Sequence, residues 1–191
     1  MKSTLVLIIL ASFFGTSTFA QNDEFKQLLA YSAPGKNHAL IGTLSGSWTF
    51  QDQQRSFVKG TVLRKAMYEG RFYTVEVTGG KLQIPVADGK MKEANYQGMQ
   101  IEGYDNAKMR FVTISLNNHI GSDLEMQMGT YDSTTRTFTY EGETELLPGT
   151  ITKNRRTLKI IDNDHYTEEY FELKNDVATK TRELRYTRAK E

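Results

Sequence analysis

Residues 98–143, GMQIEGYDNAKMRFVTISLNNHIGSDLEMQMGTYDSTTRTFTYEGE, contain the pattern that decides the predicted fold. The pattern occurs twice, at residues 104–111 (YDNAKMRF) and 131–138 (YDSTTRTF). In each copy a strand ends in Tyr, a polar turn opens on Asp, and the next strand resumes on Phe. An Asp can open such a turn because its carboxylate accepts backbone N–H groups two residues further on. The stretch therefore predicts consecutive antiparallel hairpins.

Short strands and turns continue on both sides of this stretch. Turn signals such as Gly79-Gly80 separate them, and residues 124–128 alternate apolar and polar side chains. The expected strands are 46–53, 56–68, 71–78, 81–86, 93–104, 109–118, 123–131, 136–144, 155–162 and 165–174, with 177–188 as a candidate eleventh. Sequential hairpins favour a closed barrel, because closure removes exposed edge strands. We predict an all-β, lipocalin-like, closed antiparallel up-and-down barrel of about ten strands with a short N-terminal helix.

Residues 1–20 have the pattern of a cleavable signal peptide. Lys2 precedes an apolar run at residues 5–14, and residues 18–20 (TFA) offer small side chains before a cleavage point at Gln21. The run is shorter than the ~20 residues that a membrane-spanning helix needs, so no membrane span is expected. No Cys follows the run to carry a lipid anchor. We predict export to the periplasm or the surrounding medium.

Two further segments complete the predicted domain organisation. Residues 21–45 are expected to form a helix and a lead-in segment, since Phe25, Leu28 and Leu29 share one helical face. Residues 46–191 are expected to form the barrel domain.

The composition excludes several classes of function. Lys and Arg total 24, and Asp and Glu total 23. This balance argues against a nucleic-acid-binding protein, which needs a basic surface. The chain has no cysteine, which removes disulfides, thiol nucleophiles and thiolate metal sites. An exported domain of this kind must be stabilised by its core alone.

The segment Gly46-Ser47-Trp48, after a short helix and at the first strand of a meander, resembles the opening of lipocalin-like (calycin) barrels. The resemblance implies that an Arg from the last strand stacks over this Trp and closes one end of the barrel. Arg188 occupies the corresponding place here. A planar guanidinium over an indole face is a favourable cation–π pair.

A second resemblance covers nearly the whole chain after the apolar run. The chain resembles a bacterial family called domain of unknown function 1579, through six short motifs in the same order. They are PGKNH at 34–38, IGTLSGSW at 41–48, GRF at 70–72, GYD at 103–105, GTYD at 129–132 and YTR at 186–188. The family usually has Trp where Ser115 stands and Asp where Asn117 stands, so the resemblance implies a roomier, less acidic interior here. It implies a fold and a compartment, but no activity.

The strand at 109–118 carries the first candidate ligand-binding residues. One of its faces presents Phe111, Thr113, Ser115 and Asn117, and His119 follows. An aromatic ring with a few small polar groups is the usual composition of a ligand pocket. The alternative is a solvent-facing strand surface, because alternation alone does not show which face is inside.

Two pairs of residues extend this candidate site. Met126 and Met128 suit an adaptable binding wall, because methionine is flexible and polarizable, although core packing is the commoner role. Arg64 and Arg71 lie on strands rich in apolar residues. An inward Arg would indicate an anionic ligand or a buried carboxylate partner, whereas an outward Arg would face solvent.

No catalytic or metal-binding motif stands out. The three histidines, at 38, 119 and 165, show neither His-x-His nor Glu-x-x-His spacing. His119 alone at a barrel mouth would be the one candidate for a haem ligand. Glu168 and Glu169 are adjacent, so they point to opposite faces of a strand and cannot serve one site. We assign no catalytic residue, metal site or cofactor.

Three functional hypotheses follow. The first is an exported barrel that binds a small hydrophobic or amphiphilic ligand. The second is a barrel enzyme, an isomerase or hydrolase, acting on a lipid-like substrate. The third is a structural or interaction module whose barrel is filled by side chains. The volume of the interior is the observation that separates them.

Overall fold

The structure is a computed structural model that describes residues 17–175 and 177–190. It consists of two compact units, divided after Ala33. The first contains helix α1 (Ser17–Ser32), which includes the helical face expected at residues 23–31. Residues 1–16, which carry most of the predicted signal peptide, lie outside the described residues.

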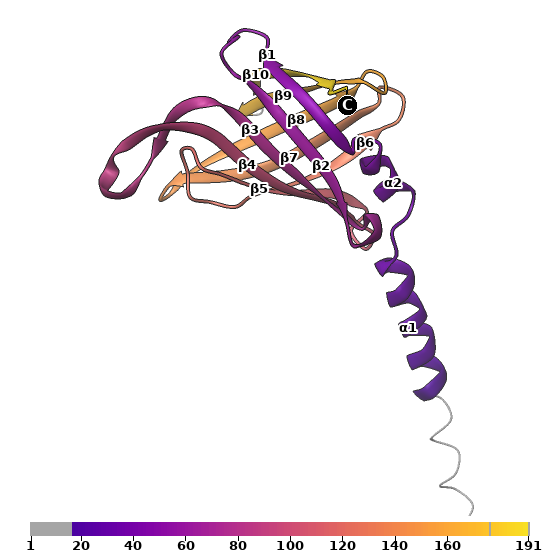
Figure 1. The fold of residues 1–191 in the computed structure, drawn as a ribbon. Helices are drawn as coiled ribbons and strands as arrows, with labels where there is room; N and C mark the ends of the chain where they lie inside the picture. Colours follow the sequence, from indigo (N-terminus) through magenta and orange to yellow (C-terminus); the bar gives the residue numbers. More distant parts are fainter. Residues whose placement is uncertain (1–16, 176, 191) are drawn as a thin grey trace, which may run out of the picture. The chain divides into compact units, whose positions relative to one another are not determined.

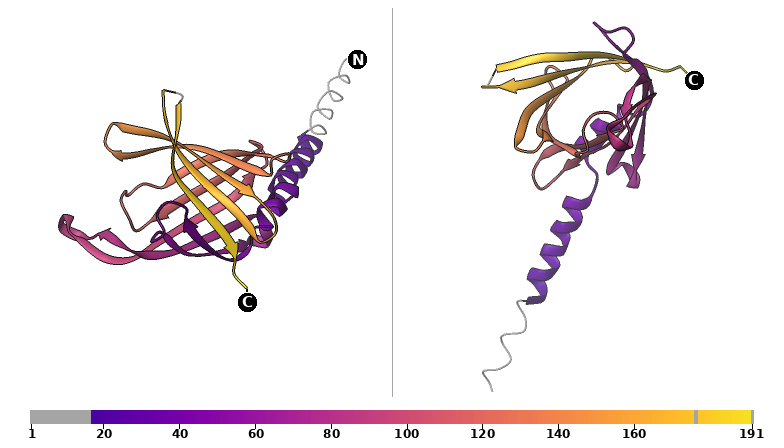
Figure 2. Two further views of the ribbon diagram at one scale, coloured as in Figure 1. Left: turned by 90° about the horizontal axis from the view of Figure 1, so that it is seen from above. Right: turned by 90° about the vertical axis from the view of Figure 1, so that its left-hand side faces the viewer.

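The second unit begins at Pro34 with helix α2 (Lys36–Gly42) and continues as strands. The ten strands are β1 (Gly46–Asp52), β2 (Lys59–Met67), β3 (Phe72–Pro85), β4 (Met91–Asp105), β5 (Arg110–Asn117), β6 (Glu125–Asp132), β7 (Thr137–Leu147), β8 (Thr150–Ile160), β9 (His165–Lys174) and β10 (Val177–Arg188). Short 3₁₀ turns, η1 (Tyr68–Gly70) and η2 (Ala87–Gly89), flank β3. Each strand pairs antiparallel with its sequence neighbour, and β1 pairs with β10 to close the ring (Figures 1 and 2). The predicted all-β closed antiparallel barrel is confirmed.

The two Asp turns of the central stretch form as predicted. Asp105 Oδ1 accepts the backbone N–H of Lys108 at 2.9 Å, and Asp132 Oδ1 accepts that of Thr134 at 2.8 Å. Each turn ends in a residue with a positive φ, at Met109 (53°) and Arg136. The side-chain bonds compensate for this uncommon backbone conformation.

Two of the predicted strands are one strand in the structure. Residues 71–78 and 81–86 form one strand, β3, with a register shift between Thr78 and Lys81. Gly79-Gly80 is therefore a bulge and not a turn, because β3 and β4 remain paired on both sides of it. The resulting β3–β4 hairpin is long and extends past its neighbours (Figures 1 and 2).

Alternation along β5 shows which face is inside. Phe111 and Thr113 are 3% and 2% exposed, whereas Leu116 on the opposite face is 42% exposed. Residues of odd number in β5 thus point into the barrel. Cross-strand pairing extends the same rule to its neighbours, where Glu102 of β4 and Gln127 of β6 are also buried.

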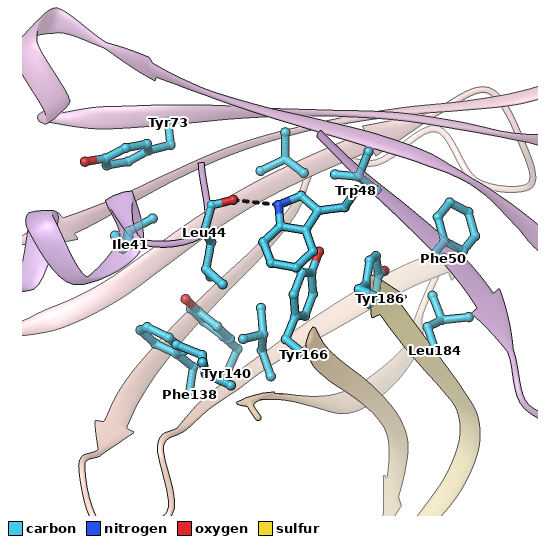
Figure 3. Packing of buried hydrophobic residues seen from close by; sticks show 14 of the residues in the cluster. Ile41, Leu44, Trp48, Phe50, Tyr73, Phe138, Tyr140, Tyr166, Leu184 and Tyr186 are labelled. Carbon is cyan, nitrogen blue, oxygen red and sulfur yellow. Dashed lines mark hydrogen bonds between the residues drawn. The ribbon is translucent and has the colours of Figure 1, made fainter. Parts of the chain in front are cut away.

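The hydrophobic core fills the end of the barrel where β1 begins. Ile41 of α2 and Leu44 just after it are buried there against Trp48, whose indole N–H donates to the Leu44 carbonyl at 2.8 Å (Figure 3). The Trp48 ring packs edge-on against Tyr166, with 4.7 Å between centroids. A helix and aromatic rings thus occupy this end, and the cavity lies toward the other end of the barrel.

Arg188 completes the closed end in the arrangement that the calycin resemblance implies. It lies opposite Trp48 in the β1–β10 pair, with its guanidinium carbon 4.1 Å from the indole centroid. Its NH1 donates to the Ser45 carbonyl at 2.7 Å and its NH2 to the Thr43 carbonyl at 3.2 Å. A single side chain thus ties the last strand to the segment that precedes the first.

Candidate functional site

The opposite end of the barrel is hollow. A cavity of about 450 Å³ opens there, and a second hollow of about 440 Å³ adjoins it. The two share seven lining residues, so they are two lobes of one mouth cavity. The shared residues are Arg55, Ser115, Asn117, Ile120, Glu125, Tyr170 and Arg182.

One wall of the larger lobe is apolar. Phe50 from β1 and Leu184 from β10 are 8% and 4% exposed. The Phe50 ring packs against that of Tyr186, with 5.6 Å between centroids, and Val77 of β3 adds an aliphatic surface. These side chains are buried by the barrel itself, and they present a preformed surface of the kind that holds apolar ligands.

The facing wall is polar. Gln100, Ser115 and Glu125 are cross-strand partners on β4, β5 and β6, so their side chains form one row across three strands. All three line the cavity. Oε1 of Gln100 is buried and has no hydrogen-bond partner among the described residues. Glu125 accepts a hydrogen bond from Gln127 at 3.0 Å.

A layer of buried charges lies between the cavity and the core. We call Arg64, Glu102, Arg156 and Glu168 the charged layer; their side chains are 3% exposed. Arg64 forms a salt bridge with Glu102 at 2.5 Å, and Arg156 one with Glu168 at 3.0 Å. The second Arg64 nitrogen lies 3.7 Å from Glu168. Two guanidinium groups and two carboxylates therefore balance in charge.

Glu168 is the most connected member of the charged layer. Its Oε2 accepts the hydroxyl groups of Tyr170 at 2.7 Å and Tyr186 at 2.8 Å. Burial acts to raise the pKa of Glu168, but the charges of Arg156 and Arg64 and these hydroxyl bonds lower it overall. Glu168 therefore stays ionised near neutral pH. Because Tyr170 and Tyr186 also line the cavity, the charged layer is its floor.

Polar contacts fix the guanidinium of Arg156 on its other sides. Its Nε donates to Oε1 of Gln127 at 3.3 Å, and its plane lies over the Tyr140 ring, 4.6 Å from the centroid. Burial raises the pKa of Tyr140, so that hydroxyl is neutral. The floor is a hydrogen-bonded network in which each charge has an opposite partner.

Arg182 differs from these arginines. It enters the cavity from β10, and its guanidinium carbon lies 3.9 Å from the centroid of Tyr170, its cross-strand partner. Its Nε is buried and has no hydrogen-bond partner among the described residues. Arg182 is thus a cation that faces open space.

A β-bulge explains how β10 presents this residue. The register of β10 against β9 shifts between Lys180 and Arg182, and the extra residue, Thr181, bonds the Tyr170 carbonyl at 3.2 Å. The shift leaves Lys180 outside, where it pairs with Glu183 at 2.7 Å. Arg182 stays on the inner face with Leu184 and faces the cavity.

The structure brings together some of the candidate residues from the sequence. Ser115, Asn117 and His119 line the larger lobe. Thr113 and Arg64 are buried deeper. The Thr113 hydroxyl accepts a hydrogen bond from Arg156 at 3.5 Å, and Arg64 belongs to the charged layer.

The other candidates lie away from the cavity. Phe111 is in the aromatic core, 4.9 Å from Phe138 between ring centroids. Arg71 is exposed beside η1. Met126 and Met128 are 51% and 38% exposed on the outer surface of β6, since Gln127 between them points inward.

The residues predicted from the sequence do not include Arg182, Tyr170 or Gln100. A signal for Arg182 was present, because it alternates with Leu184 and Tyr186 on one strand. An arginine at that spacing indicates either an inward cation or the edge of the core. Tyr170 offered a weaker signal, since aromatic residues are common on both faces of strands.

The described residues contain no cluster of three or more His, Asp and Glu side chains able to hold a metal ion. None of their helices is both long and apolar enough to cross a bilayer.

Comparison with known proteins identifies the family of the chain. No curated protein matches the chain. The profile of a family described as protein of unknown function, DUF1579, matches residues 33–188. That range includes α2, all ten strands and the Trp48–Arg188 pair. The chain therefore belongs to the DUF1579 family.

Proposed function

We propose that the barrel binds a small hydrophobic or amphiphilic molecule in its mouth cavity. The observation that carries the proposal is the larger lobe, whose volume of about 450 Å³ falls in the usual range of ligand pockets. Side chains fill the closed end and the charged layer, but they leave this lobe open. A module filled throughout by side chains would not have such a space.

The two walls suit a molecule with distinct ends. Phe50, Val77 and Leu184 would cover an apolar body, and burial of apolar surface contributes ~25 cal/mol per Å². Gln100 and Arg182 each present a buried polar atom without a partner among the described residues. Such atoms favour a ligand that supplies hydrogen bonds, because buried polar groups are costly when unpaired.

No observation favours the enzyme hypothesis to the same degree. A general base works best with a pKa near the working pH. The pKa of Glu168 is lowered, and its oxygens already interact with Arg156, Tyr170 and Tyr186. The charged layer is suited to shape and stabilise the cavity floor.

We also propose that the protein is exported to the periplasm or the medium. The proposal rests on Lys2, the apolar run at 5–14 and the small residues before Gln21. Mass spectrometry of protein expressed with its own leader in a bacterial host should give a mature chain that begins at Gln21. An uncleaved chain retained in the cytoplasm would contradict this.

The binding proposal is tested by filling the cavity. N-phenyl-1-naphthylamine, a neutral probe that fluoresces in apolar sites, should bind the wild-type protein. Ser115→Trp places an indole in the cavity and should weaken probe binding by at least about tenfold. Met126→Trp, 51% exposed on the outer surface of the adjacent strand β6, is the matched control and should bind as wild type. Absence of probe binding, or equal binding by both variants, would refute the proposal.

A further inference from the structure

We infer that the ligand carries an anionic head group, best satisfied by a carboxylate, that binds Arg182 while its apolar body lies against Phe50 and Leu184. The inference rests on the proposed function and adds the chemical class of the ligand. It follows from how Arg182 differs from the other interior arginines, and from the charges around it.

The interior arginines differ in their partners. Arg64 has Glu102 as a salt-bridge partner, and Arg156 has Glu168. Among the described residues no carboxylate forms a salt bridge with Arg182. Its buried Nε is unpaired, as is that of Arg64, but Arg64 has the carboxylate of Glu102 as a partner. A buried charge without a partner is costly. A ligand that brings an anion to this position gains the interaction that the protein does not supply.

The acidic groups near Arg182 are already engaged. Glu168 in the cavity floor attracts Arg182 electrostatically. Its two oxygens, however, bind Arg156, Tyr170 and Tyr186. Glu125 lines the same lobe and accepts the Gln127 amide at 3.0 Å. Neither side chain occupies the guanidinium edge of Arg182.

The basic groups at the rim add to the positive charge. Arg55 and Lys59 line the larger lobe together with Arg182, and Glu125 is the only carboxylate among the described residues that line it. Arg55 pairs with Asp52 at 2.7 Å, so its charge is partly offset. The second lobe adds Asp123, Glu172 and Arg155, so the excess of cations lies in the larger lobe, where it favours anions.

The position of Arg182 against Tyr170 leaves its guanidinium N–H groups free to bind a carboxylate. Its plane lies over the Tyr170 ring at 3.9 Å, so the ring covers one face. The N–H groups lie in the guanidinium plane and point away from its edges. This edge matches the two oxygens of a carboxylate in a bidentate pair.

Tyr96 supplies a second donor. It lines the lobe, and burial raises its pKa, while Arg182 acts to lower it and Glu125 to raise it. The hydroxyl therefore keeps its proton at neutral pH and can donate to an anion. A Cβ on Gly79 or Gly98 would lie 3.0 Å from an atom of Tyr96, so these glycines leave room for its side chain.

The test compares two ligands with the same chain. Decanoate and 1-decanol should each displace N-phenyl-1-naphthylamine from the wild-type protein, decanoate with about tenfold or greater preference. Arg182→Gln should weaken decanoate binding by about 10- to 100-fold, as expected for a lost charged hydrogen bond, and change 1-decanol binding less than about twofold. Arg182→Lys keeps the charge but lacks the planar edge with two donors, so it should retain only part of the preference.

Arg185→Gln is the matched control, because Arg185 lies on the same strand but is 63% exposed on the outer face. It should bind both ligands as wild type. Equal wild-type affinity for decanoate and 1-decanol, or equal losses of both in Arg182→Gln at an unchanged melting temperature, would overturn the inference and leave the proposed function standing. Binding of neither ligand nor probe would instead refute the proposed function.

Discussion

The guanidinium of Arg188 lies over the indole of Trp48 at 4.1 Å and also hydrogen-bonds two backbone carbonyls before β1, those of Ser45 and Thr43. Arg188, the last residue of β10, thus binds the segment that leads into β1. Its third nitrogen, Nε, donates to the Asn163 carbonyl at 2.9 Å in the turn before β9. One side chain therefore joins three parts of the chain at the closed end.

Replacing Arg188 should destabilise the barrel. Arg188→Ala removes the cation–π pair and three hydrogen bonds, and should lower the free energy of unfolding by about 2–4 kcal/mol. Urea denaturation followed by Trp48 fluorescence measures it. Arg185→Ala, at an exposed site of the same strand, should stay within about 0.5 kcal/mol of wild type. Equal midpoints for the two variants would contradict the role assigned to Arg188.

Local patterns were sufficient to predict the architecture. The paired Asp turns at Asp105 and Asp132 set the hairpins, and both form the expected side-chain bonds. The pair Gly79-Gly80 was misread as a turn because Gly serves bulges and turns alike. Telling these apart requires knowing that β3 and β4 pair beyond it, which is non-local information.

The interior was harder to predict for a similar reason. Alternation separates the two faces of β6 but does not say that Gln127 is inside and that Met126 and Met128 are outside. Hydrophobicity alone suggests the reverse. The polar side chain is inside because Arg156 and Asn154 on β8 offer it partners. β6 and β8 both pair with β7, so this contact depends on the order of strands in the sheet, which the alternation along β6 does not contain.

Stability should fall when the buried His38 is forced to take up a proton. Burial lowers the pKa of His38, although a backbone hydrogen bond with Tyr104 acts to raise it. In the unfolded chain the imidazole binds a proton near pH 6.5, while in the folded chain it does so only at lower pH. The unfolded state therefore binds more protons below pH 6.5, and the free energy of unfolding decreases as the pH falls through that window.

Urea denaturation at a series of pH values from 7.5 downward measures this slope. His38→Gln retains hydrogen-bonding groups but cannot titrate, so it should flatten the slope just below pH 6.5. His165→Gln, at the exposed first residue of β9, is the control and should keep the slope. The same slope in all three proteins would assign it to other groups.

Gly60 should not tolerate a side chain. A Cβ there would lie 2.8 Å from Gly79 Cα and 2.8 Å from Phe50 Cε1, and closer still to the Thr78 carbonyl. Two of these are backbone atoms of β3 that cannot move without breaking the β2–β3 pairing. Gly60→Ala should therefore cost about 1–3 kcal/mol of unfolding free energy, as overpacking does. Gly80→Ala, where the nearest atoms lie 3.5 and 3.9 Å away in ordinary contact, should stay within about 0.5 kcal/mol of wild type. Thermal melts measure this: the melting temperature should fall in Gly60→Ala and stay near wild type in the control, and equal melting temperatures would contradict the prediction.

Glu168 should be the most sensitive residue of the cavity floor. Glu168→Gln leaves Arg156 without its salt bridge and removes charged acceptors from Tyr170 and Tyr186. Losing one partner of a buried ion pair costs about 3–5 kcal/mol, because the other charge stays buried. The matched control is Glu169→Gln on the same strand, whose outward side chain pairs with Lys180 at 3.0 Å and should cost no more than about 1 kcal/mol.

A second substitution separates the loss of the pair from the loss of Glu168 itself. The double variant Glu168→Gln with Arg156→Met removes both charges of the salt bridge, so it should be more stable than Glu168→Gln alone. Equilibrium denaturation of the two single variants, the double variant and the wild type completes the cycle. If the loss of unfolding free energy in the double variant equals the sum of the losses in the two single variants, the two side chains act independently. The floor would then be held by its tyrosine hydroxyl groups, and not by the charges that surround them.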